Sequence, residues 1–75
     1  MLLSELKKGD SAIITGFIGD SRRIIERGIR ANKEVCLISI APLKDPLMYK
    51  IDGQFYALRK DEANTIEVEL LSRGF

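Results

Sequence analysis

The 75-residue sequence contains no histidine and a single cysteine, Cys36. Histidine is the commonest general base and metal ligand in proteins, so its absence excludes Ser-His-Asp and Cys-His catalytic sets and most tight iron or zinc sites. One cysteine cannot form a disulfide within the chain, which suits a reducing compartment. Because Cys36 lies between Val35 and Leu37, we expect it to be a small buried hydrophobic residue rather than a reactive thiol.

Long apolar runs and a large net charge are also missing. No run approaches the ~20 residues that span a membrane, and at residues 1–8 the charge follows the apolar stretch, opposite to the order in a secretory signal. Twelve Lys and Arg against eleven Asp and Glu leave a net charge of +1, whereas dedicated nucleic-acid binders are far more basic. We therefore expect a cytoplasmic protein with no direct membrane insertion and no nucleic-acid partner.

What is present is the composition of a globular chain, with 45% hydrophobic and 31% charged residues. A chain of this length allows one domain, which we expect to cover residues 1–75. Segments rich in β-branched and aromatic residues alternate with glycine, proline, Asn and Asp, which favours short strands over a helical bundle. Strands are predicted at residues 12–18, 34–41, 47–51, 54–59 and 65–70.

Local patterns refine these strands. Gly16 indicates a bulge or bend within the first strand. Asp52-Gly53 predicts a two-residue hairpin turn, because a type I′ turn needs two residues that tolerate positive φ. Ile66, Val68 and Leu70 alternate with polar residues, as in a half-buried strand. The order predicts a mostly β fold, in which about five antiparallel strands form a small, partly closed barrel.

One segment, residues 20–28, has a helical period instead. Asp20 and Ser21 can cap its first turn, and Gly28 suits the left-handed position after its last turn. The residues then available to the core are Ile24, Ile25 and Ile29. We expect a short α-helix inserted after the first strand.

Five motifs occur in order along the chain. They are Leu3-x-x-Leu6-x-x-Gly9, the helix end Gly28-Ile29, Ala41-Pro42-x-x-Asp45-Pro46, Gly53-x-x-x-Ala57-Leu58-Arg59 and Glu62-Ala63-x-x-Ile66-x-Val68. With these motifs, over about residues 2–70, the chain resembles the FeoA family, small cytosolic proteins that accompany the ferrous-iron transporter FeoB. The resemblance implies an SH3-like β-barrel.

The resemblance also implies a function, that of a non-enzymatic accessory protein of bacterial Fe(II) uptake. Such a protein needs no cofactor and contacts the cytosolic part of FeoB at the inner membrane. The same barrel is similar to the C-terminal module of DtxR-type repressors, so a metal- or ligand-sensing regulatory module is the alternative. Two positions depart from the family pattern. Ala31-Asn32 replaces Pro-Gly, in a turn that Asn tolerates, and Arg27 replaces an apolar residue before Gly28.

Two segments are candidates for partner binding. Residues 22–33 hold five cations and one acid. They form either a solvated helix face or a docking surface for an acidic protein face or anionic lipid headgroups, since Arg binds carboxylate and phosphate bidentately. In residues 41–46, two prolines flank an exposed pair, as a rigid connection or as a second contact. The predicted partner-binding residues are Arg22, Arg23, Arg27, Arg30, Leu43 and Lys44.

Other side chains receive structural roles. The carboxylate pairs Asp61 with Glu62 and Asp45 with Asp52 lie in turns, where Asp commonly bonds its own backbone, so no metal site is predicted. The aromatic residues Phe17, Tyr49, Phe55 and Tyr56 are expected in the core, although a nucleic-acid-binding barrel, the third hypothesis, would use them for stacking. Unpaired barrel edges allow weak self-association, and the order of residues 71–75 stays open.

Overall fold

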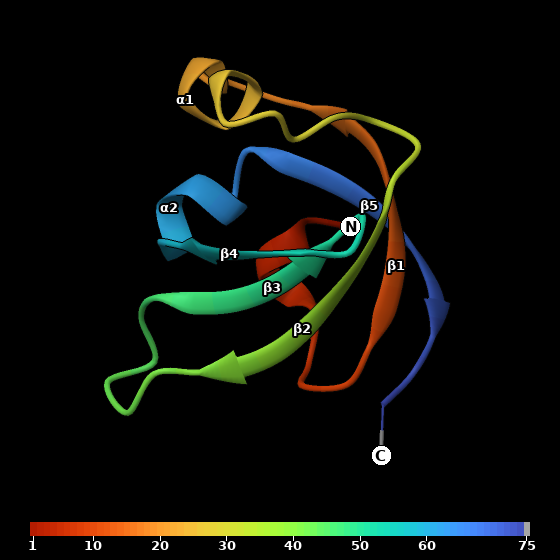
Figure 1. Ribbon diagram of the computed structural model, residues 1–75, viewed down its shortest axis with the longest axis vertical. Helices are drawn as coiled ribbons and strands as arrows, with labels where there is room; N and C mark the ends of the chain where they lie inside the picture. The colour runs from red at the N-terminus through yellow and green to blue at the C-terminus, as the bar shows by residue number, and fades with distance from the viewer. Residues whose placement is uncertain (75) are drawn as a thin grey trace.

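The computed structural model describes residues 1–74, which form one curled, five-stranded antiparallel sheet with three short helices (Figure 1). The elements are η1 (Leu3–Glu5), β1 (Ser11–Phe17), α1 (Arg22–Glu26), β2 (Glu34–Ile40), β3 (Leu47–Ile51), β4 (Gln54–Leu58), α2 (Lys60–Ala63) and β5 (Ile66–Ser72). The strand order is β4-β3-β2-β1-β5, so β4 and β5 are the two edges. The predicted mostly β fold is confirmed, with the sheet curled but unclosed among the described residues.

The core lies inside this curl and is one cluster of aliphatic side chains around Tyr49. Tyr49 is 0% exposed, and its hydroxyl donates to the carbonyl oxygen of Leu3 at 3.3 Å. This bond ties η1 to β3, the strand next to the edge strand β4. Burial raises the pKa of the Tyr49 phenol above its usual range, because the charged form would lose its hydration.

The predicted turns are confirmed by the backbone. Asp52 and Gly53 have φ of 50° and 81°, as the two-residue hairpin between β3 and β4 requires. The register of β1 against β5 shifts between Ile14 and Gly16, which is the expected bulge. Asn32 has φ of 68°, so the turn that departs from the family pattern keeps a left-handed residue.

The helix after β1 is shorter than predicted. α1 ends at Glu26, and Gly28 follows it with φ of 88°, as expected for a helix stop. The prediction that Ile25 joins the core is wrong, because its side chain is 54% exposed while Ile24 and Ile29 are buried. Neighbouring residues on a helix point about 100° apart, so a single short turn buries Ile24 and turns Ile25 outward.

Two other expectations are corrected. Phe55 is 65% exposed and lies outside the core, because β4 is an edge strand and this residue points away from the buried side. The helix α2 was not predicted, because the sequence analysis assigned its residues to a turn.

The C-terminal strand β5 runs to Ser72 and Gly74 is described, so of residues 71–75 only Phe75 lies outside the described residues. In residues 1–74, no helix has the length and apolar character needed to cross a membrane.

Candidate partner-binding surface

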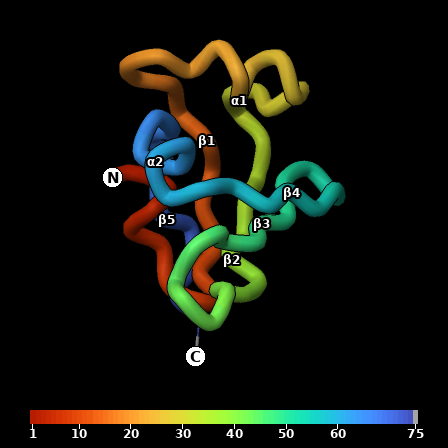
Figure 2. The backbone as a smooth tube through the Cα atoms, turned by 90° about the vertical axis from the view of Figure 1, so that its left-hand side faces the viewer, coloured from red at the N-terminus to blue at the C-terminus, as the bar shows by residue number. Residues whose placement is uncertain are grey.

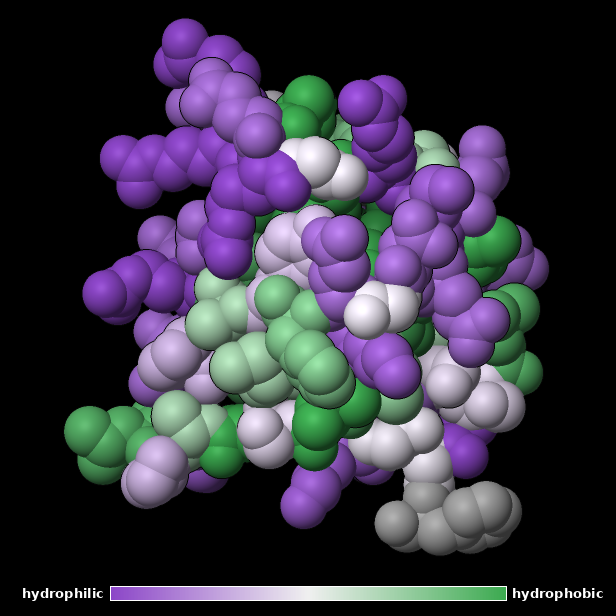
Figure 3. Space-filling model, in the orientation of Figure 1, coloured by the Kyte–Doolittle hydropathy of each residue, from purple (hydrophilic) through white to green (hydrophobic). Residues whose placement is uncertain are grey.

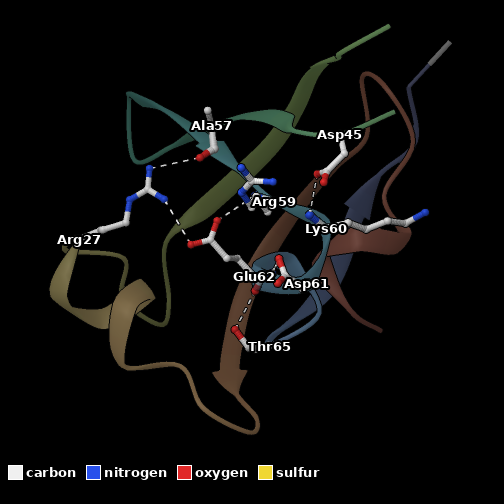
Figure 4. A network of polar contacts seen from close by, with 8 residues as sticks. All are labelled: Arg27, Asp45, Ala57, Arg59, Lys60, Asp61, Glu62 and Thr65. Carbon is white, nitrogen blue, oxygen red and sulfur yellow. Dashed lines mark hydrogen bonds and ion pairs between the residues drawn. The ribbon is translucent and has the colours of Figure 1, made fainter. Parts of the chain in front are cut away.

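Arg27 connects the end of α1 to the edge strand β4 and to the helix α2, as Figure 4 shows. Its Nη2 donates to the carbonyl oxygen of Ala57 on β4 at 3.3 Å, and its Nη1 lies 3.8 Å from Oε2 of Glu62 on α2. The guanidinium carbon also lies 5.6 Å from the centre of the Tyr56 ring, within cation–π range. Arg27 therefore docks α1 by polar contacts at the position where the family pattern has an apolar residue.

The carboxylates around α2 are occupied by backbone groups. Oε1 of Glu62 accepts from the Arg59 N–H at 2.9 Å, and Oδ1 of Asp45 accepts from the Lys60 N–H at 2.9 Å. Asp61 accepts from the Glu62 N–H in the same way. These bonds satisfy orphan donors of a short helix, which explains why it forms there. Among residues 1–74, no group of three or more His, Cys, Asp or Glu is placed to hold a metal ion.

The other arginines of the predicted surface are more exposed. Arg22 lies 3.3 Å from the carboxylate of Asp20, with both side chains largely in solvent, and such pairs add little stability. Arg23 and Arg30 are exposed, and neither forms an ion pair within residues 1–74. Arg22 and Arg23 border a groove of about 430 Å³ between α1 and α2. This groove is also lined by acids, including Glu26, so its charge is mixed.

The second predicted contact lies elsewhere on the molecule. Leu43 is 90% exposed, and Lys44 has φ of 68° in the loop between β2 and β3. Figures 1 and 2 both place this loop at the opposite end from α1. In Figure 3, hydrophilic side chains gather over α1, and hydrophobic ones protrude at the tip of this loop. The six predicted residues therefore form two separate surfaces, and their binding of a partner stays a prediction.

One polar feature, the buried Asp10, was missed by the sequence analysis, and the predicted burial of Cys36 is only partly confirmed. Asp10 is 2% exposed, and its carboxylate accepts from the N–H groups of Lys7 at 2.9 Å and Gly74 at 2.7 Å. Cys36 is half-buried rather than fully buried, and its Sγ lies 3.8 Å from the carbonyl oxygen of Leu37. Asp10 ties the C-terminal segment to the start of β1, a long-range contact that no spacing in the sequence indicates.

Replacing Arg27 with methionine tests its docking role. Arg27→Met keeps the apolar stem but loses the contacts with Ala57 and Glu62, so the free energy of unfolding should fall by about 1 kcal/mol. Urea unfolding measures the change. The matched control is Arg22→Met, which should cost less than about 0.5 kcal/mol because Arg22 bonds only the exposed Asp20. Equal losses in the two variants would contradict the docking role.

The geometry defines a class of protein, a small SH3-like β domain with a polar surface around one short helix. The sequence matches the FeoA domain family over residues 1–70. It is 41% identical over 75 residues, 96% of this chain, to an Fe(2+) transport protein A/Fe(2+) transporter FeoB fusion protein of Porphyromonas gingivalis. It is 35% identical over 74 residues, 95% of this chain, to a putative Fe(2+) transport protein A of Campylobacter jejuni. The chain belongs to the FeoA family.

The chain spans 9% of the fusion protein and 100% of the Campylobacter relative. Solved structures agree with the fold. An FeoA-like protein from Clostridium acetobutylicum matches with a TM-score of 0.89 at 29% identity, over 100% of this chain and 91% of that one. The zinc complex of Stenotrophomonas maltophilia FeoA, described as an SH3 domain protein, matches with a TM-score of 0.77 at 29% identity, over 92% and 89%. A T. acidophilum IdeR matches in fold alone, with a TM-score of 0.76 at 20% identity, over 93% of this chain and 33% of that one.

Proposed function

We propose that this protein is a non-enzymatic accessory protein of ferrous-iron uptake that associates with the cytosolic part of a FeoB-type transporter. The observation that carries the proposal is the fusion relative, in which a sequence 41% identical to this chain is part of one polypeptide with a FeoB transporter. Two domains that are fused in one protein often bind each other when they are separate chains in another. The fusion therefore supports association of this chain with a FeoB-type transporter. A cytoplasmic location, at the membrane face where such a transporter presents its cytosolic part, follows from the proposal.

The exposed arginines support a surface for this association. Arg22, Arg23 and Arg30 lie in or close to α1, at one end of the molecule, and their guanidinium groups are accessible. A planar guanidinium binds carboxylates in pairs of hydrogen bonds, which makes arginine effective at protein interfaces. Leu43 and Lys44 supply a second surface at the other end. Regulation of the transporter by contact needs no catalytic group in this chain.

Co-purification tests the association. The tagged protein should retain the FeoB-type transporter encoded in the same genome from gently solubilised membranes. Reversal of Arg22, Arg23 and Arg30 to glutamate should reduce recovery about tenfold or more, because three attractive contacts become repulsive. A second variant, in which serine replaces Leu43 and Lys44, tests the second surface. Recovery of no transporter by the folded wild-type protein would contradict the proposed function.

The alternative hypothesis, a metal- or ligand-sensing regulatory module, has weaker support than association with the transporter. It depends on likeness to a repressor at 20% identity, which concerns the fold alone. The zinc in the Stenotrophomonas structure belongs to that protein. Sensing therefore stays a prediction of the resemblance, and association with the transporter is the preferred function.

A further inference from the structure

The outer edge of β4 carries backbone groups that point away from the sheet. The Asp52 N–H donates to the carbonyl oxygen of Glu34 on β2 at 3.1 Å, so the backbone of Asp52 faces β2 and that of the preceding Ile51 faces β4. Ile51 is paired with Gln54, and directions alternate along a strand. The backbone N–H and carbonyl groups of Gln54, Tyr56 and Leu58 therefore point toward β3. The backbone groups of Phe55 and Ala57 point outward, away from the sheet.

Arg27 forms a hydrogen bond with one of these outward backbone groups. It donates to the Ala57 carbonyl oxygen, as the alternation requires of an outward acceptor. Within residues 1–74, the Ala57 N–H and both backbone groups of Phe55 form no bond with a loop, cap or side chain. Phe55 is 65% exposed and Ala57 is exposed too, so solvent reaches this part of the edge. An edge of this kind accepts an added strand.

A positively charged groove runs beside this edge. It has a volume of about 320 Å³ and lies between the end of α1 and the β3–β4 hairpin. Its polar lining residues are Arg27, Arg30, Lys33, Asp52, Gln54 and Tyr56. Three of these are cations and one is an acid. The acid, Asp52, lies 3.7 Å from Lys33 with both side chains exposed, which is a contact that a competing carboxylate can replace.

We propose that an extended acidic segment of a partner protein adds to the edge of β4, with its carboxylates bound by Arg27, Arg30 and Lys33. The outward groups of Phe55 and Ala57 would supply main-chain pairing, and the cations of the groove would select negative side chains. The inference rests on the proposed function, because it assigns this segment to the cytosolic part of the transporter. Arg27 covers the Ala57 carbonyl in the free protein and turns to a carboxylate of the segment on binding.

A second copy of this chain fits the edge less well. The acidic strand that it could offer is β5, which carries Glu67 and Glu69. The outer side of β5 is already occupied, because the Val68 N–H donates to the carbonyl oxygen of Met1 at 2.8 Å and the Met1 amino group donates to the carbonyl oxygen of Val68 at 3.1 Å. A segment of another protein is therefore the better occupant of the β4 edge.

Binding and amide hydrogen exchange test the proposal together. The probe is the purified cytosolic part of the FeoB-type transporter encoded in the same genome. In its presence, the amides of Phe55 and Ala57 should become protected from exchange. Arg30→Glu should weaken binding about tenfold, since it reverses a charge in the groove. Lys8→Glu is the matched control, a reversal of another exposed cation that lies outside this groove, and should change affinity less than about twofold.

The outcomes separate the two proposals. If the folded wild-type protein binds no transporter fragment, the proposed function fails, and this inference fails with it. If the fragment binds but the Phe55 and Ala57 amides stay unprotected, or Lys8→Glu weakens binding as much as Arg30→Glu, the proposed function stands and the β4 site is wrong. Protection that rises with protein concentration without the fragment would assign the edge to a second copy and overturn the acidic-segment proposal.

Discussion

Tyr49→Ala is expected to lower the free energy of unfolding by about 3–5 kcal/mol, the range for removing a buried aromatic ring. Tyr49 is fully buried in the interior strand β3, paired with Leu37 on one side and Tyr56 on the other. A domain of this size has a total stability of about 4–11 kcal/mol. The loss is therefore a large share of the total stability, and circular dichroism during urea titration measures it.

Tyr49→Phe is the matched control, because it keeps the ring and removes only the hydroxyl. The hydroxyl donates to the Leu3 carbonyl oxygen, which also accepts from the Leu6 N–H at 3.1 Å. That carbonyl is left with a partner, so the cost should be about 1 kcal/mol or less. A loss in Tyr49→Phe as large as in Tyr49→Ala would show that the hydrogen bond, and not the volume of the ring, stabilises the core.

Asp10→Asn should lower the melting temperature at neutral pH. The melting temperature of this variant should also fall less than that of the wild-type protein when the pH is lowered. The N–H of Gly74 and then that of Lys7 bond the carboxylate and hold its pKa below the ordinary 3.8, with Arg73 adding to the effect against the opposing influence of burial. Asparagine has one acceptor oxygen, so its amide nitrogen would face one of the two N–H donors. A buried donor without a partner is costly.

The sign of the pH dependence follows from the lowered pKa. The stabilising contribution of Asp10 is present above the unfolded pKa of 3.8 and is lost as the pH falls through the lower folded value. Melting curves from about pH 7 to about pH 2.5 should show this loss in the wild-type protein and less of it in Asp10→Asn. Glu69→Gln, at an exposed position on β5, is the control at neutral pH. If the melting temperature of Asp10→Asn fell with pH as steeply as that of the wild-type protein, the Asp10 carboxylate would not be the source of the acid sensitivity.

The strands were predictable because their determinants are local. The turn at Asp52-Gly53 needs only two residues that accept positive φ, and Gly16 itself marks the position of the bulge in β1. The helix α2 was not predictable, since it is capped by Asp45 from a distant loop as well as by its own Glu62. The exposure of Phe55 depends on which strand lies at the sheet edge, and composition does not determine strand order.

The candidate surface was predictable in composition but not in arrangement. The sequence placed Arg27 among the docking residues because it stands where an apolar residue was expected. Its contacts with Ala57 and Glu62 join segments more than 25 residues apart, which a single sequence does not reveal. The open edge of β4 was anticipated only as a general property of unpaired strands. Its charged groove appears only when Lys33 and the hairpin are brought beside α1.

The separation of α1 from the β2–β3 loop has a consequence for how a partner is held. The two surfaces lie at opposite ends of a molecule 31 Å long (Figure 1). A partner that touches both makes a bivalent attachment, in which the first contact raises the effective concentration of the second. Each contact is then weak alone and strong in combination. Removing either end would release the partner without changing a residue at the other.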